Sequence, residues 1–236
     1  MKKTDFFKGI KDGLPICIGY LSVAFAFGIF STESGLTIIE ALLISMTNVT
    51  SAGQLAGVPI IASGGSLLEL AATQFVINSR YALMSVSLSQ RLGKNIRMID
   101  RLLISFVNTD EVFAIAMGQG KALDRKYMYG LILTPYIGWS VGTLVGAVAG
   151  NILPHIITSA LGIAIYGMFI AIVVPETKKH RPSALCVLFT IALSCAFSYI
   201  PALKSVPNGF VIIICAAAAS AVFAFAAPVK VEDTDE

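Results

Sequence analysis

Ionisable side chains inside apolar stretches are the residues of this sequence best suited to chemistry. Arg80 lies in one such stretch, and Asp110 and Glu111 lie in the next one along the chain. Charges are costly in hydrocarbon unless they face protein or water, so their presence there needs a cause. A guanidinium can bind a carboxylate through two parallel hydrogen bonds, and a carboxylate can bind a cation. These residues therefore predict a polar site for charged groups.

Uncharged polar residues accompany these charges in the first half of the chain. Those that we expect to share the site are Asn48, Thr50, Ser51, Gln54, Asn78 and Asn108. Transporters commonly build sites near the membrane midplane from interrupted helices, whose freed backbone groups line a cavity. We expect such a break at Gly53, within an otherwise apolar stretch.

Structural explanations compete with this functional one. Arg80 can pair permanently with Asp110 or Glu111, because an unpaired charge in the membrane would be intolerable. Gln54 and Asn48 can simply hydrogen-bond across helices, as amides commonly do inside membrane proteins. The residues alone leave both readings open.

The composition indicates what positions these residues. Of the 236 residues 56% are hydrophobic and only 13% are charged, and the mean hydropathy is +0.81, which excludes an ordinary soluble domain. Apolar stretches recur at 14–31, 36–62, 66–90, 102–118, 127–149, 152–174, 183–200 and 210–228. Their lengths suit helices that cross a bilayer, and they lack the alternation of a β-barrel. The sequence predicts an all-α, polytopic transmembrane bundle of about seven to eight segments, interrupted or re-entrant in the first half.

A glycine stripe marks the second half of the chain. Gly138, Gly142, Gly146 and Gly150 recur every four residues and leave one helix face almost without side chains. We expect this face to pack inside the protein, and a docking face for a partner subunit is the alternative. The sequence thus predicts one integral membrane domain over 1–236. It has a polar-site half (1–118), a packing half (119–228) and an acidic cytoplasmic tail (229–236).

The basic residues predict the orientation. Lysines before the first stretch place the amino terminus in the cytoplasm by the positive-inside rule. If all eight stretches cross, eleven basic residues lie inside and five outside, with the basic linker 91–101 on the wrong side. If stretch 102–118 and one of the two before it are re-entrant hairpins, the distribution becomes fifteen to one. Both versions leave both termini in the cytoplasm.

Several function classes are excluded. The two histidines lie in loops and the four cysteines show no CxxC spacing, so we expect no metal and no histidine-based hydrolase. A phosphate-binding GxxxxGK[ST] run is absent from the sequence, and a net charge of +3 is too small for a nucleic-acid binder. We expect a protein that is not an enzyme, has no cofactor, contacts membrane lipid and can form an oligomer.

The order of motifs resembles a known family. The sequence has Phe25-x-Phe27-Gly28 at the end of its first stretch, then Ser51-Ala52-Gly53-Gln54, Asn78-Ser79-Arg80-Tyr81 and Thr109-Asp110-Glu111-x-Phe113. This order is similar to the bacterial branched-chain amino-acid exporters of the azaleucine-resistance (AzlC) type, which form the large subunit of a two-component exporter. The resemblance implies export of the hydrophobic amino acids valine, leucine, isoleucine and methionine across the bacterial inner membrane, with a small membrane subunit of AzlD type as partner.

The polar residues suit such a substrate. Arg80 is expected to bind the carboxylate of the amino acid, and Asp110 or Glu111 its ammonium group. Phe106, Phe113 or Ile77 would then supply an apolar wall. Since the sequence shows no nucleotide-binding device, we expect an ion gradient as energy source, with Asp110 and Glu111 as proton-coupling candidates. A channel-like pore and a non-transporting scaffold or sensor are the alternatives.

Overall fold

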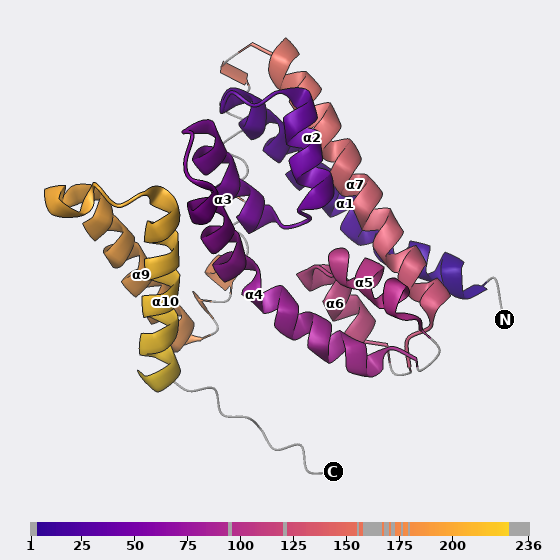
Figure 1. Ribbon diagram of the computed structural model, residues 1–236. Coiled ribbons are helices and arrows are strands. Elements are labelled where there is room, and N and C mark those ends of the chain that lie inside the picture. The colour runs from indigo at the N-terminus through magenta and orange to yellow at the C-terminus, as the bar shows by residue number, and fades with distance from the viewer. Residues whose placement is uncertain are drawn as a thin grey trace.

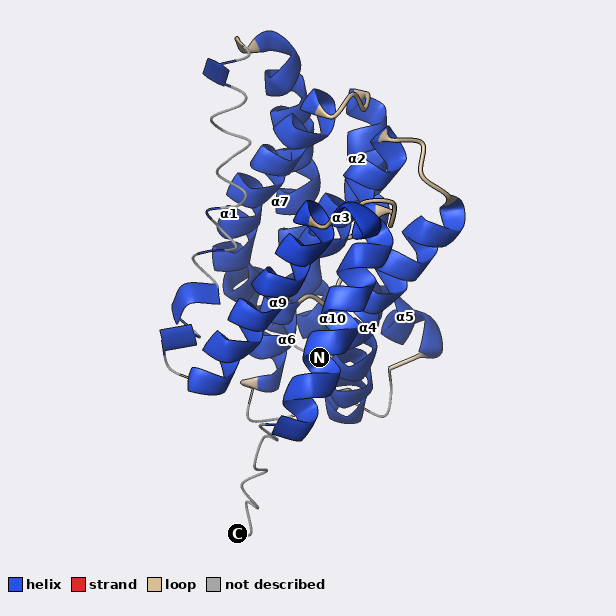
Figure 2. Ribbon diagram, turned by 90° about the vertical axis from the view of Figure 1, so that its left-hand side faces the viewer, coloured by secondary structure: helices blue, strands red, loops and turns tan. Residues whose placement is uncertain are grey.

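The computed structural model describes residues 4–93, 96–119, 122–154 and 180–226, and short pieces at 156–157, 167, 170, 173–175 and 177–178 (Figure 1). The helices are α1 (Thr4–Glu33), α2 (Ile38–Thr47), α3 (Ser51–Ala62), α4 (Leu67–Arg91), α5 (Met98–Phe106), α6 (Asp110–Met117), α7 (Arg125–Ile152), α9 (Arg181–Tyr199) and α10 (Asn208–Ala226), with a 3-10 turn η1 (Pro201–Leu203). These described ranges contain no strand, so the predicted all-α class is confirmed (Figure 2).

The frame of the molecule is a close parallel pair formed by α1 and α7 (Figure 1). Along α7, the predicted stripe meets α1 in ascending order: Gly138 faces Cys17, Gly142 faces Leu21, Gly146 faces Phe25 and Gly150 faces Thr32. Because glycine has no side chain, the two backbones can approach closely. The stripe therefore packs inside the protein, and the prediction of internal packing is confirmed.

Helices α2 and α3 form a hairpin that enters from the end where α1 finishes. Helix α2 begins with a capping box between Thr37 and Glu40 and descends along α7, where Ser45 Oγ lies 2.6 Å from Thr143 Oγ1. After three non-helical residues α3 climbs back, and its Val58 packs in one apolar cluster with residues of α1. The predicted interruption of stretch 36–62 is confirmed.

The break itself lies at 48–50, so the prediction of a break at Gly53 is wrong. Thr50 has an extended backbone and its Oγ1 accepts a hydrogen bond from the Gly53 nitrogen at 3.2 Å, which makes Thr50 the N-cap of α3. Gly53 lies inside α3, where its missing side chain makes room for Gln74 of α4. A glycine is required at position 53 because α3 and α4 pack closely there, and it does not break the helix.

Helices α5 and α6 form a second hairpin, which enters from the end where α1 and α7 begin. The ring of Phe106, at the end of α5, lies 6.4 Å from that of Tyr136, near the middle of α7. Helix α6 returns after the break at 107–109. The linkers on either side of this hairpin pair with each other, because the Gly93 nitrogen donates to the Leu123 carbonyl at 3.1 Å and the Leu123 nitrogen to the Arg91 carbonyl at 3.0 Å.

These linkers define the basic end of the molecule, which carries Lys8, Arg91, Arg97, Arg101 and Arg125. Lys8 of α1 donates to Gln119 at 2.7 Å, so the start of α1 lies at the same end as both linkers. The version with eight full crossings is therefore wrong, and the version with two hairpins holds. Within it, stretch 66–90 is the continuous helix α4, which connects the two ends.

Four described helices, α1, α7, α9 and α10, are long and apolar enough to cross a membrane by themselves. The predicted count of seven to eight segments is thus supported only loosely, since two stretches are hairpins. Most of the predicted stretch 152–174, and the tail 229–236, lie outside the described residues.

Helix α10 packs on α9 and on α4, where the Gly209 nitrogen donates to Glu69 Oε1 at 2.9 Å.

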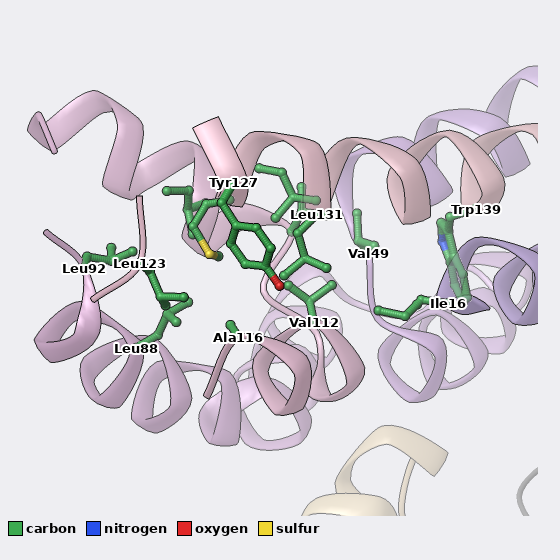
Figure 3. Close-up of a cluster of buried hydrophobic side chains, with 14 of the residues drawn as sticks. Ile16, Val49, Leu88, Leu92, Val112, Ala116, Leu123, Tyr127, Leu131 and Trp139 are labelled. Atoms are coloured by element: carbon green, nitrogen blue, oxygen red, sulfur yellow. The ribbon is translucent and has the colours of Figure 1, made fainter. Parts of the chain in front are cut away.

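The largest apolar cluster fixes the second hairpin to the frame (Figure 3). Val112 and Ala116 of α6 lie between Leu88 of α4 and Leu131 of α7, and all four side chains are almost completely buried. Burying such side chains contributes about 1.5–3 kcal/mol each for the larger ones. The hairpin tip is consequently held by packing on its returning helix.

Substituting a stripe glycine should loosen the frame. In Gly146→Ala the new methyl group would meet the backbone of Phe25, so we expect unfolding to become easier by about 1–3 kcal/mol, the usual cost of overpacking. Thermal unfolding in detergent, followed by circular dichroism, measures this. Gly19→Ala on α1 is the matched control, because its methyl group meets no atom within 4 Å. Equal melting temperatures for the two variants would contradict the close contact.

Labelling from the two sides of the membrane tests the hairpins. In a background without native cysteines, Gln90→Cys should react with an impermeant maleimide from the same side as Lys11→Cys, and Ser63→Cys from the other side. The three positions are exposed in the structure. Eight full crossings would give the reverse pattern for positions 63 and 90.

Candidate site in a cavity between two hairpin tips

The first hairpin tip (residues 48–50) and the second (residues 107–109) meet against the middle of α1 and α7. Together with these helices they line a cavity of about 290 Å³. Its polar lining comes from Tyr20, Thr50, Ser51, Tyr81, Thr109, Asp110 and Glu111, and its apolar lining from Pro15, Ile16, Gly19, Val23, Val49 and Trp139. Small-molecule sites usually start at about 300 Å³, so this cavity fits a small ligand. Of the predicted site residues, the structure brings Thr50, Ser51, Asp110 and Glu111 to its surface.

Two carboxylates at the start of α6 dominate the polar wall. Asp110 Oδ2 forms an ion pair of 2.7 Å with Arg80 Nη1, and both side chains are about half exposed, at 45% and 50%. Glu111 has a different partner, because the Tyr20 hydroxyl donates to its Oε2. None of the ion pairs among the described residues involves Glu111. One carboxylate is therefore neutralised by a cation and the other is only hydrogen-bonded.

Tyr20 connects this acidic pair to the frame. Its hydroxyl oxygen lies 2.7 Å from Thr109 Oγ1, next to Glu111, and its ring packs edge-on against Trp139 with centroids 5.0 Å apart. The Thr109 side chain makes no cap bond to α6, so it is free for this contact. Tyr20 and Trp139 are functional candidates that sequence reasoning missed. Their partners are distant in sequence and no local spacing signalled them.

The apolar wall differs from the predicted one. Ile16 and Val23 of α1, Val49 of the first tip and Trp139 of α7 form it. The predicted wall residues Phe106, Phe113 and Ile77 do not line this cavity. Phe106 lines a separate cavity, and Phe113 packs on the apolar core. Phe106 and Phe113 would share one face of a continuous helix, and the break at 107–109 interrupts that spacing.

An amide network ties the first tip to α4. Asn48 and Asn78 both donate to Gln74 Oε1, at 3.1 and 3.0 Å, while Gln74 Nε2 donates to the Gly53 carbonyl at 2.7 Å. Thr50 Oγ1 completes the network by donating to Asn78 Oδ1 at 2.9 Å. Asn48 and Asn78 do not line the cavity, and their contacts hold the tip in place.

Gln54, Asn108 and Arg80 also lie outside the cavity lining. Gln54 is 1% exposed and both of its amide atoms lack a described hydrogen-bond partner, as does Asn108 Oδ1. Asn108 Nδ2 donates to Ser85 Oγ at 3.3 Å. Arg80 adds to its ion pair a hydrogen bond of 3.2 Å to the Tyr81 hydroxyl, and its guanidinium lies over that ring. Arg80 thus reaches the site through Asp110 and Tyr81.

The two halves of the site have matching architecture. Helix α1 is followed by the hairpin α2–α3 from one end, and α4, which runs the opposite way, is followed by α5–α6 from the other end (Figure 1). Thr50 and Thr109 hold the same position, directly before the returning helix of each hairpin. Secondary transporters with inverted repeats place their substrate where such half-helices meet.

Comparisons with known proteins place the chain in a family. Inner membrane protein YgaZ of Escherichia coli K12 is 30% identical over 191 residues, which cover 78% of this chain and 77% of that protein. An uncharacterized membrane protein of Archaeoglobus fulgidus is 31% identical over 185 residues, covering 78% and 81% respectively. No solved structure matches. The AzlC protein family matches residues 15–153, the part that contains both hairpins and the cavity. The chain therefore belongs to the AzlC protein family.

Proposed function

We propose that the protein is a secondary transporter that exports valine, leucine, isoleucine and methionine across a bacterial cytoplasmic membrane. Membership of the AzlC family and the similarity to named membrane proteins support a transport-related role in a membrane. The observation that carries the proposal further is the cavity between the two hairpin tips. It has one acidic wall, one apolar wall and a size suited to a small ligand.

A zwitterionic amino acid with an aliphatic side chain complements this cavity. Its ammonium group binds at Glu111 and Asp110, where one carboxylate has no cation of its own. Its carboxylate lies at the N-terminus of α3, near the Ser51 hydroxyl and the positive end of the helix dipole. Its side chain packs on Ile16, Val23 and neighbouring residues. In this arrangement Arg80 positions Asp110 and does not itself bind the substrate.

The hairpins also suggest how access alternates. One enters from the basic end and the other from the opposite end, so a shift of either against the α1–α7 frame opens the cavity to one side only. Glu111 and Asp110 are the proton-coupling candidates, since an ammonium group and a proton compete for the same carboxylate. Coupling to an ion gradient follows from this competition.

Orientation and partner complete the proposal. The described residues of the basic linker 91–101 lie at the end where α1 begins, which supports placing this end in the cytoplasm by the positive-inside rule. Pairing with a small membrane subunit of AzlD type rests on family membership. The outward faces of α9 are available for such contacts, since its residues are not buried.

Removing the uncompensated charge should stop transport. We expect Glu111→Gln to lower leucine counterflow in proteoliposomes at least about tenfold, because a charged hydrogen bond is worth roughly 1.5–3 kcal/mol. Ser79→Ala, on an exposed position of α4, is the control and should transport normally. Full counterflow in Glu111→Gln, with the protein present in the membrane, would show that this site is not the substrate site. A channel-like pore would show no counterflow in either protein.

Exchanging the paired charges separates a carrier from a scaffold. The double variant Arg80→Asp with Asp110→Arg keeps an ion pair across the same contact but removes a carboxylate from the cavity wall. We expect normal protein levels in the membrane and strongly reduced export of leucine from cells fed leucine dipeptides. If export returned to the native rate, the pair would be purely structural and the proposed site would be wrong.

A further inference from the structure

A second and larger cavity, of about 730 Å³, opens at the basic end between α1, α5 and α7. It shares no lining residue with the cavity at the hairpin tips. Phe6 of α1 closes one side, and the other walls come from α5 and α7. The second hairpin thus leaves a gap between its first helix and the frame, and the residues that line this gap indicate what fills it.

The mouth of this cavity is basic. Arg97 at the start of α5 and Arg125 and Lys126 at the start of α7 line it, together with one acid, Asp100. Asp100 is 3% exposed and accepts a hydrogen bond of 2.7 Å from the Tyr129 hydroxyl. Its Oδ2 lies 3.4 Å from Arg97 Nε and 3.5 Å from Arg125 Nη1. The carboxylate of Asp100 therefore contacts two guanidinium groups. The three basic side chains and one acidic side chain of the lining leave a net charge of +2.

The depth of the cavity is apolar. Leu103 and Phe106 of α5 face Leu133 and Tyr136 of α7 across it, and the first three are 47%, 49% and 45% exposed. From Arg125 to Tyr136, α7 rises about 16 Å, roughly half the thickness of a hydrocarbon core. A basic mouth above an apolar wall of this height matches one lipid molecule within a single leaflet.

We propose that this cavity binds an anionic phospholipid of the leaflet at the basic end. Its phosphate lies between Arg97, Arg125 and Lys126. A guanidinium group can bind a phosphate through two parallel hydrogen bonds, and basic pockets between membrane helices bind anionic headgroups. Its acyl chains pack along Leu103 and Leu133. The bound lipid fills the gap beside α5 and thereby braces the hairpin whose tip carries Asp110 and Glu111.

Native mass spectrometry of the purified full chain tests this proposal. The probes are phosphatidylglycerol, phosphatidylcholine and glycerol 3-phosphate, which separate an anionic lipid from any lipid and from a free phosphate. We expect phosphatidylglycerol to bind most tightly, with affinity falling about fivefold for each basic side chain removed in Arg125→Gln and Lys126→Gln. Arg91→Gln, a basic-end residue outside the cavity lining, is the control and should bind as the native chain does.

Other results would overturn the proposal. Equal binding of phosphatidylcholine would show that the mouth does not select the headgroup, and binding of glycerol 3-phosphate alone would show a phosphate site without a lipid. Equal losses in Arg91→Gln would show a diffuse surface effect. Because Arg125→Gln leaves Asp100 with fewer partners, Lys126→Gln, whose side chain makes no described ion pair, keeps the test valid if Arg125→Gln does not fold. Lipid binding is measured without transport, so this outcome does not depend on the proposed function.

Discussion

A helix that stops within a membrane leaves backbone groups without partners, and the rest of this structure depends on how those groups are satisfied. At the first tip Thr50 caps α3, and Gln74 of α4 donates to the Gly53 carbonyl while it accepts from Asn48 and Asn78. These contacts satisfy the backbone groups that the break frees, so the interrupted helix is stable inside the protein. They also explain why so many amides gather in one region without lining the cavity.

The two hairpin tips are held together because a close pair of helices supports them. The glycine contacts between α1 and α7 let Tyr20 and Trp139 lie together at the level where the tips meet. Tyr20 then holds Glu111 on one side of the cavity, and Arg80 holds Asp110 from α4. The proposed substrate contacts, access from either end and lipid site beside α5 all rest on this division between a fixed frame and two supported tips.

Much of this architecture could be predicted from the sequence, because charge and hydropathy act locally. The distribution of basic residues makes two re-entrant hairpins one of the two predicted arrangements, and the glycine stripe predicts internal packing. The exact break could not be predicted, since capping by Thr50 competes with a glycine three residues later. Phe106 and Phe113 do not line the cavity, because the break at 107–109 interrupts the helical periodicity that relates them. Tyr20 was missed because its partners are about ninety residues away.

Protection of a cysteine at the first tip tests the central claim most directly, namely that the tips enclose the substrate cavity. Ser51→Cys lines this cavity, whereas Ser79→Cys lies outside it on the exposed face of α4. In a background without native cysteines, leucine should slow the reaction of a small thiol reagent with Ser51→Cys and leave Ser79→Cys unchanged. If leucine changed neither rate while the protein still exported it, the cavity between the tips would not be where the substrate binds.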